Sequence, residues 1–347
     1  MKYSTVNIES FGYELPPNVV TSEDLEDRLS PLYEELHIQK GQLEALSGIR
    51  ERRFWNPGFK MSTGAIKAGM KAVESSSISP DQIDMLIYGG VCRDHLEPAT
   101  ACAVANGLGL KPQTHLYDVS NACLGVLNGM VQVANSIELG HIRAGLVVSC
   151  ESAREIVEST IERLLTTLNM DIFKKTIATL TGGSGAVAVL LTSNLISQNG
   201  HRLLGGTSRS AAEHHNLCTW GSDKAMLTTG HQNLETDSAS VLKHGVVLGL
   251  ETYRAFNKNL GWQSSDKPDK IVCHQVGSTH QSNILKALGI PEKKDFTTFQ
   301  YLGNIGTVSL PITVAIASER GFFKKNDLLG LFGIGSGLNC MMLGIKW

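Results

Sequence analysis

Apolar residues follow two different patterns along this chain. Short runs that are almost wholly apolar, at 83–91, 144–150 and 184–191, predict buried strands. Between them, stretches such as 62–75 and 126–138 carry apolar residues every three to four positions, which predicts helices with one buried face. Strands without a polar side need cover on both faces. The alternation therefore predicts a layered α/β protein.

The second half of the chain repeats the pattern of the first. In position and pattern, the segments at 203–208, 269–278, 327–337 and 338–345 correspond to those at 6–12, 84–91, 144–152 and 184–191. We therefore expect two similar halves, residues 1–195 and 196–347, with helices packed between two sheets.

Composition and charge argue against several classes of protein. The chain has 347 residues, of which 42% are hydrophobic and 18% charged, and this is typical of a globular protein. A formal net charge of −2 without a dense basic run argues against nucleic acid as a partner. The apolar runs are too short to span a bilayer. Seven cysteines without a CxxC pair, and no signal-peptide pattern, indicate reduced thiols in the cytoplasm and no zinc site.

A cysteine stands where a predicted strand gives way to a predicted helix. The strand is 115–119, the helix runs to about residue 138, and Cys123 lies between them. A thiol there faces the unpaired N–H groups and the positive end of the helix dipole, which favours the thiolate and so a nucleophile. Small neighbouring residues leave room for a substrate. The alternative is a small buried side chain, the commonest role of a lone cysteine.

Three features of the second half could take part in chemistry, and each has a structural alternative. His274 follows a predicted strand, where α/β proteins place ligand-facing groups, although many single histidines only support the fold. Asn304 lies near glycines and can equally be a turn former. The glycine-rich segment 333–337 exposes backbone N–H groups, which suits a tight turn or an oxyanion site.

Three segments of the first half are also open to two interpretations. The polar loop at 92–101 contains Glu97, and such loops are more often solvated than catalytic. The cations at 50–53 either form a surface turn or bind a phosphate-bearing ligand. The apolar stripe within 152–175 either lines an acyl channel or packs in the core.

Together these segments resemble a known family over essentially the whole chain. The resemblance is to the thiolase superfamily, in its ketoacyl synthase III branch, and rests on Ser47-Gly-Ile-Arg-Glu-Arg-Arg, Asp118-Val-Ser-Asn-Ala-Cys, His274-Gln-Val, Gly303-Asn-Ile-Gly and Gly333-Ile-Gly-Ser-Gly. Within the branch, Arg93-Asp-His-Leu-Glu-Pro-Ala-Thr-Ala and Ile334-Gly-Ser-Gly-Leu-Asn-Cys resemble OleA, the condensing enzymes of head-to-head olefin biosynthesis. The resemblance implies an α/β, thiolase-like five-layered αβαβα fold with two similar halves, and a homodimer.

The resemblance also implies an activity, a Claisen condensation of two long-chain acyl-CoA molecules without decarboxylation. Cys123 would carry the first acyl group, and the N–H groups of Cys123 and Ser336 would hold its oxyanion. His274 and Asn304 match the pair that holds the enolate oxygen. Glu97 matches the glutamate that reaches in from the partner subunit as the base. The product would be a 2-alkyl-3-ketoacyl compound. Coenzyme A enters as the substrate carrier, so neither a cofactor nor a metal is expected, and downstream pathway enzymes could be further partners.

Other functions stay open on the residues alone. A decarboxylating 3-oxoacyl-ACP synthase III would take its carbanion from malonyl thioester and would need no base such as Glu97. A non-catalytic acyl-binding relative could keep the fold without the reaction. A degradative thiolase fits less well, because the glycine turn contains no second cysteine and Cys340 lies beyond it.

Overall fold

The computed structural model describes residues 1–198, 200–221, 233–262 and 267–347. Its main element is a nine-stranded sheet with the strand order β11-β12-β13-β8-β1-β7-β6-β4-β5. The strands of the first half are β1 (Val6–Glu14), β4 (Met85–Gly89), β5 (His115–Val119), β6 (Ala144–Glu151) and β7 (Gly185–Ser193). Those of the second half are β8 (His201–Ser210), β11 (Lys270–Cys273), β12 (Leu328–Gly335) and β13 (Asn339–Lys346).

The nine strands form two half-sheets that meet along one short seam. Two ladder pairs of β1 and β8 join them, Asn7 with Arg202 and Ile8 with His201, and Lys2 adds an isolated bridge to Gly205. Within each half-sheet the registers are long, for example eight pairs between β6 and β7 and eight between β12 and β13. The two half-sheets therefore act as separate layers although their strands are continuously hydrogen-bonded.

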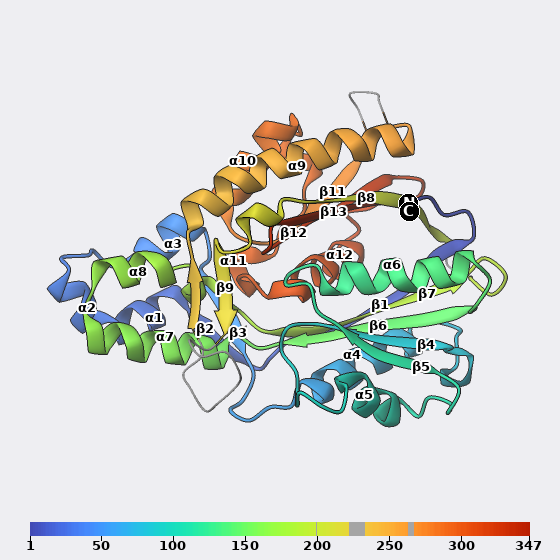
Figure 1. Cartoon of the computed structure of the whole chain (residues 1–347), viewed down its shortest axis with the longest axis horizontal. Helices are drawn as coiled ribbons and strands as arrows, with labels where there is room; N and C mark the ends of the chain where they lie inside the picture. Colours follow the sequence, from blue (N-terminus) through green and yellow to red (C-terminus); the bar gives the residue numbers. More distant parts are fainter. Residues whose placement is uncertain (199, 222–232, 263–266) are drawn as a thin grey trace.

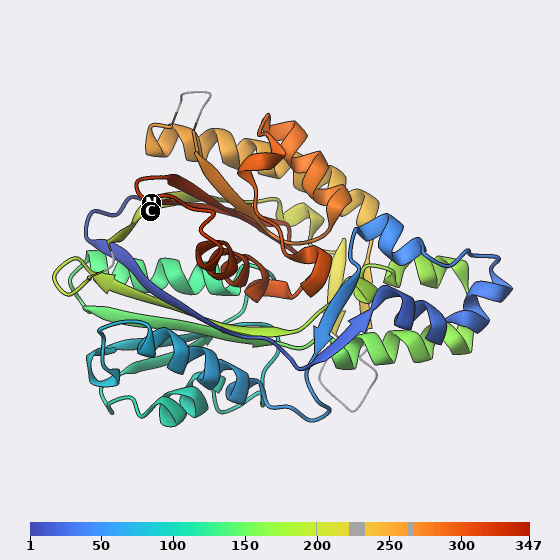
Figure 2. The ribbon, with the colours of Figure 1, turned by 180° about the vertical axis from the view of Figure 1, so that it is seen from behind.

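Helices cover both half-sheets on both faces, as Figures 1 and 2 show. The middle layer contains α6 (Gly125–Glu138) and α12 (Ser309–Glu319), which contact strands of the first and, for α12, also of the second half-sheet. One outer layer contains α4 (Met61–Glu74) and α5 (Thr100–Leu108), and the other contains α9 (Ser238–Leu260) and α10 (Ser278–Leu288). This is the predicted five-layered αβαβα architecture, and the prediction of fold class is confirmed.

The burial of the helices follows from their sequences. Helix α12 is buried at every position from Ser309 to Ala317 because it lies between two sheets, whereas α4 buries only one face, rich in Gly and Ala. The largest core cluster contains residues of both half-sheets together with α6 and α12. The central layer therefore holds the two halves together, in addition to the short seam.

A lobe of short elements lies beside the layers. It contains β2 (Asn18–Thr21), α1 (Ser22–Arg28), α2 (Ser30–Glu35), α3 (Gln42–Ser47), β3 (Glu51–Phe54), α7 (Arg154–Thr167), α8 (Met170–Thr176), β9 (Cys218–Gly221) and β10 (Asn233–Thr236). Local signals set the helix starts: Thr21 and Asp24 form a capping box on α1, and Asn169 caps α8. The last short helix, α11 (Phe299–Leu302), precedes α12.

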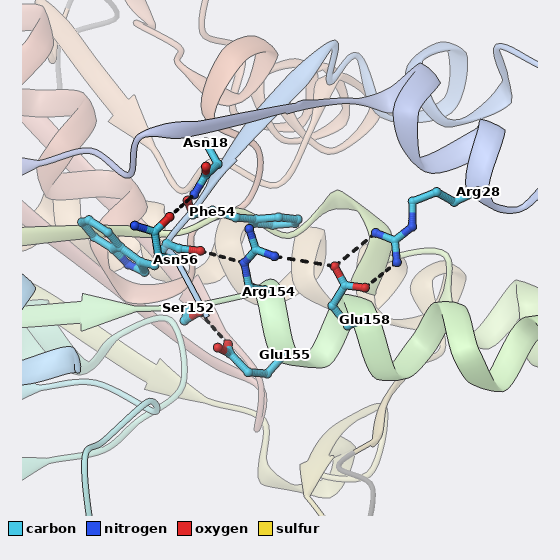
Figure 3. Close-up of polar contacts among 9 residues, drawn as sticks. Asn18, Arg28, Phe54, Asn56, Ser152, Arg154, Glu155 and Glu158 are labelled. Carbon is cyan, nitrogen blue, oxygen red and sulfur yellow. Dashed lines mark hydrogen bonds and ion pairs between the residues drawn. The ribbon is translucent and has the colours of Figure 1, made fainter. Parts of the chain in front are cut away.

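Arg154 at the start of α7 holds elements of this lobe together, as Figure 3 shows. Its Nε donates to the carbonyl oxygen of Trp55 at 2.7 Å, and its guanidinium lies over the ring of Phe54. Glu158 on the same helix forms ion pairs with both Arg154 and Arg28.

The structure favours core packing as the role of the apolar stripe within 152–175, since Ile156, Ile161 and Leu164 are buried against α1 and α2.

Candidate active site

Cys123 lies in the turn between β5 and α6, where the sequence places it. The turn is tight: Leu124 N donates to Asn121 O at 2.9 Å, and Ala122 has a φ of 44°. Helix α6 begins two residues later with Gly125, whose backbone is packed on the backbone of Gly89 at the end of β4. A Cβ on Gly125 would lie 2.9 Å from the Gly89 carbonyl carbon. The close approach of helix and strand therefore fixes the position of the cysteine.

The ionisation of Cys123 differs from the sequence expectation. Burial raises the pKa of the thiol to about 12, and electrostatic interactions with Cys218 and Glu151 act in the same direction. A hydrogen bond with the residue's own backbone lowers it only in part. The expectation of a thiolate is therefore wrong for the free enzyme, because the helix-dipole argument left out desolvation. A thiol at this position must lose its proton before or while it acts as a nucleophile.

The glycine-rich segment of β12 and the following turn lies against the start of α6. A Cβ on Gly335 would lie 3.3 Å from Cys123 N, and one on Gly333 would lie 2.5 Å from Leu127 Cδ1. The Asn339 side chain donates to Asn121 Oδ1 at 3.2 Å and to Ser336 O at 3.3 Å. The turn that contains Ser336 is thereby held beside the turn that contains Cys123.

His274 follows directly after β11, and its backbone N–H donates to Phe332 O of β12 at 2.9 Å. Burial, together with the nearby His280, lowers the pKa of His274 to about 3. The imidazole is therefore neutral and has one N–H to donate. Beside it lies a cavity of about 20 Å³, lined also by His280, Cys273 and Gly333, which has room for about one water molecule.

Asn304 lies in the turn between α11 and α12. Its backbone N–H donates to Thr181 O, its carbonyl accepts from Gly183 N, and its side-chain oxygen accepts from Gly306 N at 3.2 Å. A few residues later, Thr307 Oγ1 accepts from Val126 N in the first turn of α6 at 2.8 Å. The Asn304 turn is thus bound to the helix that follows Cys123.

Glu97 is exposed in this chain. It lies in the loop between β4 and α5, and the end of that loop is fixed by Asp118, which accepts from Thr100 N at 2.9 Å and Ala101 N at 3.0 Å. The structure thus brings the turns of Cys123, Ser336 and Asn304 together, and places His274 on the strand beside β12. It leaves Glu97 on the surface.

The sequence analysis missed the burial of two further residues, Glu151 and Arg52. Glu151 is buried at the end of β6 and interacts electrostatically with Cys123. The only signal was a carboxylate at the end of an otherwise apolar strand. Arg52, one of the candidate anion-binding cations, is fully buried and donates to Ser22 Oγ, so it is closed to a surface ligand. Among the described residues, no group of three or more His, Cys, Asp or Glu is placed to hold a metal ion.

Comparison with known proteins defines the class first. Residues 60–227 match the family described as "Thiolase, N-terminal domain", and residues 259–347 match "3-Oxoacyl-[acyl-carrier-protein (ACP)] synthase III C terminal". The fold is thus that of a thiolase-type condensing enzyme.

Full-length relatives define the group more closely. The chain is 50% identical to the acyl-CoA:acyl-CoA alkyltransferase of Shewanella oneidensis and 35% identical to that of Xanthomonas campestris, with all of each chain covered. A Xanthomonas campestris OleA structure with bound lauric acid and lauroyl-CoA matches 99% of this chain and 100% of its own, at 35% identity and a TM-score of 0.93. A cerulenin-bound structure of the same protein has a TM-score of 0.94, at 35% identity and with 100% of this chain and 98% of its own covered. The chain belongs to the OleA family of acyl-CoA:acyl-CoA alkyltransferases.

Proposed function

We propose that this protein joins two long-chain acyl-CoA molecules by a Claisen condensation without decarboxylation. The observation that carries the proposal is the match, over the whole length of both chains, to a curated acyl-CoA:acyl-CoA alkyltransferase at 50% identity. The product is a 2-alkyl-3-ketoacyl compound. Neither the decarboxylating synthase nor the non-catalytic acyl-binding relative is favoured by these relatives.

In the first half-reaction Cys123 receives an acyl group. Its sulfur attacks the thioester carbon and loses its proton, the bond from that carbon to the sulfur of CoA breaks, and CoA leaves as the thiol. The backbone N–H groups of Cys123 and Ser336 hold the oxyanion, and the adjacent position of their turns supports this pairing. Coenzyme A is the carrier of the substrate, and the reaction uses no further cofactor.

In the second half-reaction a second acyl-CoA becomes the nucleophile. Glu97 removes its α-proton, and the side chains of His274 and Asn304 donate hydrogen bonds to the enolate oxygen. A neutral imidazole can donate without adding charge, in agreement with the lowered pKa of His274. The α-carbon then attacks the acyl-Cys123 carbonyl, the carbon–carbon bond forms, and the sulfur of Cys123 leaves.

The proposed base requires a dimer. Glu97 is exposed, and β5, beside its loop, pairs only with β4 among the described strands, which leaves the outer edge of β5 open. Leu96, next to Glu97, is 69% exposed. An open strand edge beside an exposed leucine suits a contact between two copies of the chain. We place the homodimer interface there, with each Glu97 in the partner's site.

The proposed location of the enzyme in the cell is the cytoplasm. Among the described residues no helix is long and apolar enough to cross a membrane. Together with the reduced thiols, this supports an enzyme of the cytoplasm that takes acyl-CoA from solution and passes its product to a downstream pathway enzyme.

Incubation with acyl-CoA alone, without a malonyl donor, tests the reaction. The wild-type enzyme should give ketoacyl products that combine two acyl chains, detected by mass spectrometry, and a mixture of chain lengths would also report its chain preference. Absence of such products, with products appearing only when malonyl thioester is added, would establish a decarboxylating synthase instead.

Replacement of Glu97 by Ala tests the base. The variant should lose condensation by at least about a hundredfold while CoA release during acylation of Cys123 continues, because Glu97 is proposed to act as the base of the second half-reaction alone. Glu74→Ala, a change at an exposed carboxylate at the end of α4, is the matched control and should leave both half-reactions unchanged. Undiminished condensation in Glu97→Ala would refute the assignment.

A further inference from the structure

Glu151 is a buried carboxylate, and burying a charged group costs free energy unless other groups hydrogen-bond to it. It is the last residue of β6 and is only 5% exposed. Burial raises its pKa, which hydrogen bonds partly oppose. A carboxylate kept at such a position without an ion-pair partner needs several hydrogen-bond donors. The question is therefore which groups supply them.

The donors belong to the loop that contains Glu97. Glu151 Oε1 accepts from Val91 N at 2.8 Å, and Oε2 accepts from Cys92 N at 3.2 Å. Both N–H groups belong to the first residues after Gly90, where the loop leaves β4. A Cβ on Gly90 would lie 3.0 Å from Glu151 Oε1, so a side chain there would crowd the carboxylate. The loop is thus held by Glu151 at its start and by Asp118 at its end.

The other residues near Glu151 belong to the site around Cys123, the proposed nucleophile. Its charge interacts with Cys123, and a Cβ on Gly306, in the turn after Asn304, would lie 3.5 Å from its Cγ. The titratable groups that interact with Glu151 are Tyr88, Cys92, Arg93, Cys123 and Cys150. Those that interact with Cys123 are Glu151 and Cys218. Glu151 therefore lies between three parts of the site that are distant in sequence.

We propose that Glu151 is a positioning residue, whose carboxylate fixes the start of the loop that carries Glu97 while its negative charge faces Cys123. This rests on the proposed function of Glu97. Two neighbouring N–H donors require a side chain that only accepts, which an ionised carboxylate provides and an amide NH2 does not. A displacement of about 1 Å in a catalytic group can cost on the order of a hundredfold in rate, so the loop anchor matters for condensation. The charge adds to the effect of burial, which is the main cause of the raised pKa of Cys123.

Two variants separate the two roles. Glu151→Gln removes the charge and turns one acceptor into a donor, whereas Glu151→Asp keeps the charge but withdraws the oxygens from the loop. Glu155→Gln is the matched control, since Glu155 is exposed and accepts from Ser152 Oγ (Figure 3). The measurements are the pH profile of iodoacetamide alkylation of Cys123, followed by peptide mass spectrometry, and the ratio of condensed product to CoA released.

The expected results differ between the variants. Glu151→Gln should move the alkylation profile to lower pH, with on the order of threefold more thiolate at a given pH, because the repulsive charge is gone. Glu151→Asp should keep the wild-type profile. Both should lower the ratio of condensation to CoA release about tenfold or more, and Glu155→Gln should change neither.

Other results would overturn the assignment. A Glu151→Gln enzyme with the profile and ratio of Glu155→Gln would show that Glu151 has no role in the site. If Glu151→Gln does not fold, the test is the ratio of condensed product to CoA released in Glu151→Asp. An unchanged ratio in that variant would refute the role of Glu151 in fixing the loop. The alkylation profile needs no condensation, so it remains informative even if the wild-type enzyme proves not to condense acyl-CoA.

Discussion

The protonation of Cys123 sets how its reactivity should depend on pH. Since the pKa of the thiol is about 12, the thiolate is a minor form at neutral pH. Alkylation of Cys123 by iodoacetamide should rise about tenfold for each unit between pH 7 and 10, because the thiolate fraction does so below the pKa. Mass spectrometry of the Cys123 peptide measures this rate. A plateau beginning near pH 7 would contradict the raised pKa and restore the sequence expectation of a thiolate.

Single residues were predictable in position but not in ionisation. The change from strand to helix placed Cys123 correctly, because that change is visible in the local pattern of apolar residues. Its pKa depends first on burial and then on the groups at 218 and 151, which no local pattern connects to residue 123. Glu151 itself was missed for the same reason, since its donors lie about sixty positions away in sequence. Whether the five predicted site residues act as proposed stays a prediction.

Helix α6 and strand β4 touch through glycine, and this contact positions Cys123, the proposed nucleophile. Gly125→Ala would bring a methyl group within 2.9 Å of the Gly89 carbonyl carbon, where backbone must move. We expect a lower melting temperature, from about 1–3 kcal/mol of overpacking, and at least roughly tenfold slower acylation of Cys123. Circular dichroism and CoA release measure the two effects.

The control for this contact is Gly221→Ala. Among the described residues, no atom beyond its chain neighbours lies within 4 Å of the Cβ position there, so stability and acylation should stay at the wild-type level. Wild-type acylation in Gly125→Ala would show that the start of α6 tolerates displacement and that the glycine contact does not position Cys123.

The elements themselves could largely be predicted, since strands such as β6 and β7 are continuous apolar runs and α4 has a single apolar face. The seam between β1 and β8 could not, because it consists of two residue pairs that leave no periodic signal. The burial of Arg52 could not be predicted either. In the sequence Arg52 belongs to a run of cations, and only the fold places it against Ser22 and away from solvent.

The duplication relates the two halves but does not make them equivalent. In the order of the sheet, β4, β6, β7 and β1 correspond to β11, β12, β13 and β8. The first half has one more strand, β5, at an open edge of the sheet, and Cys123 follows this strand. Cysteine and exposed glutamate thus both lie near the edge that could meet a second copy. The proposed dimer interface therefore lies in the half that contains Cys123 and Glu97.

Intersubunit complementation tests this arrangement. A Cys123→Ala chain and a Glu97→Ala chain, each inactive in condensation alone, should regain activity when they are co-expressed with different affinity tags. In the mixed dimer one site has both lesions, and the other combines an intact Cys123 with an intact Glu97 from the partner. Random pairing should give about a quarter of the wild-type condensation per chain, because half of the dimers are mixed and each has one working site. Dimers purified through both tags should reach about half. If Glu97 served its own chain, both sites of the mixed dimer would be dead, and doubly tagged dimers without activity would refute the exchange of Glu97 between subunits.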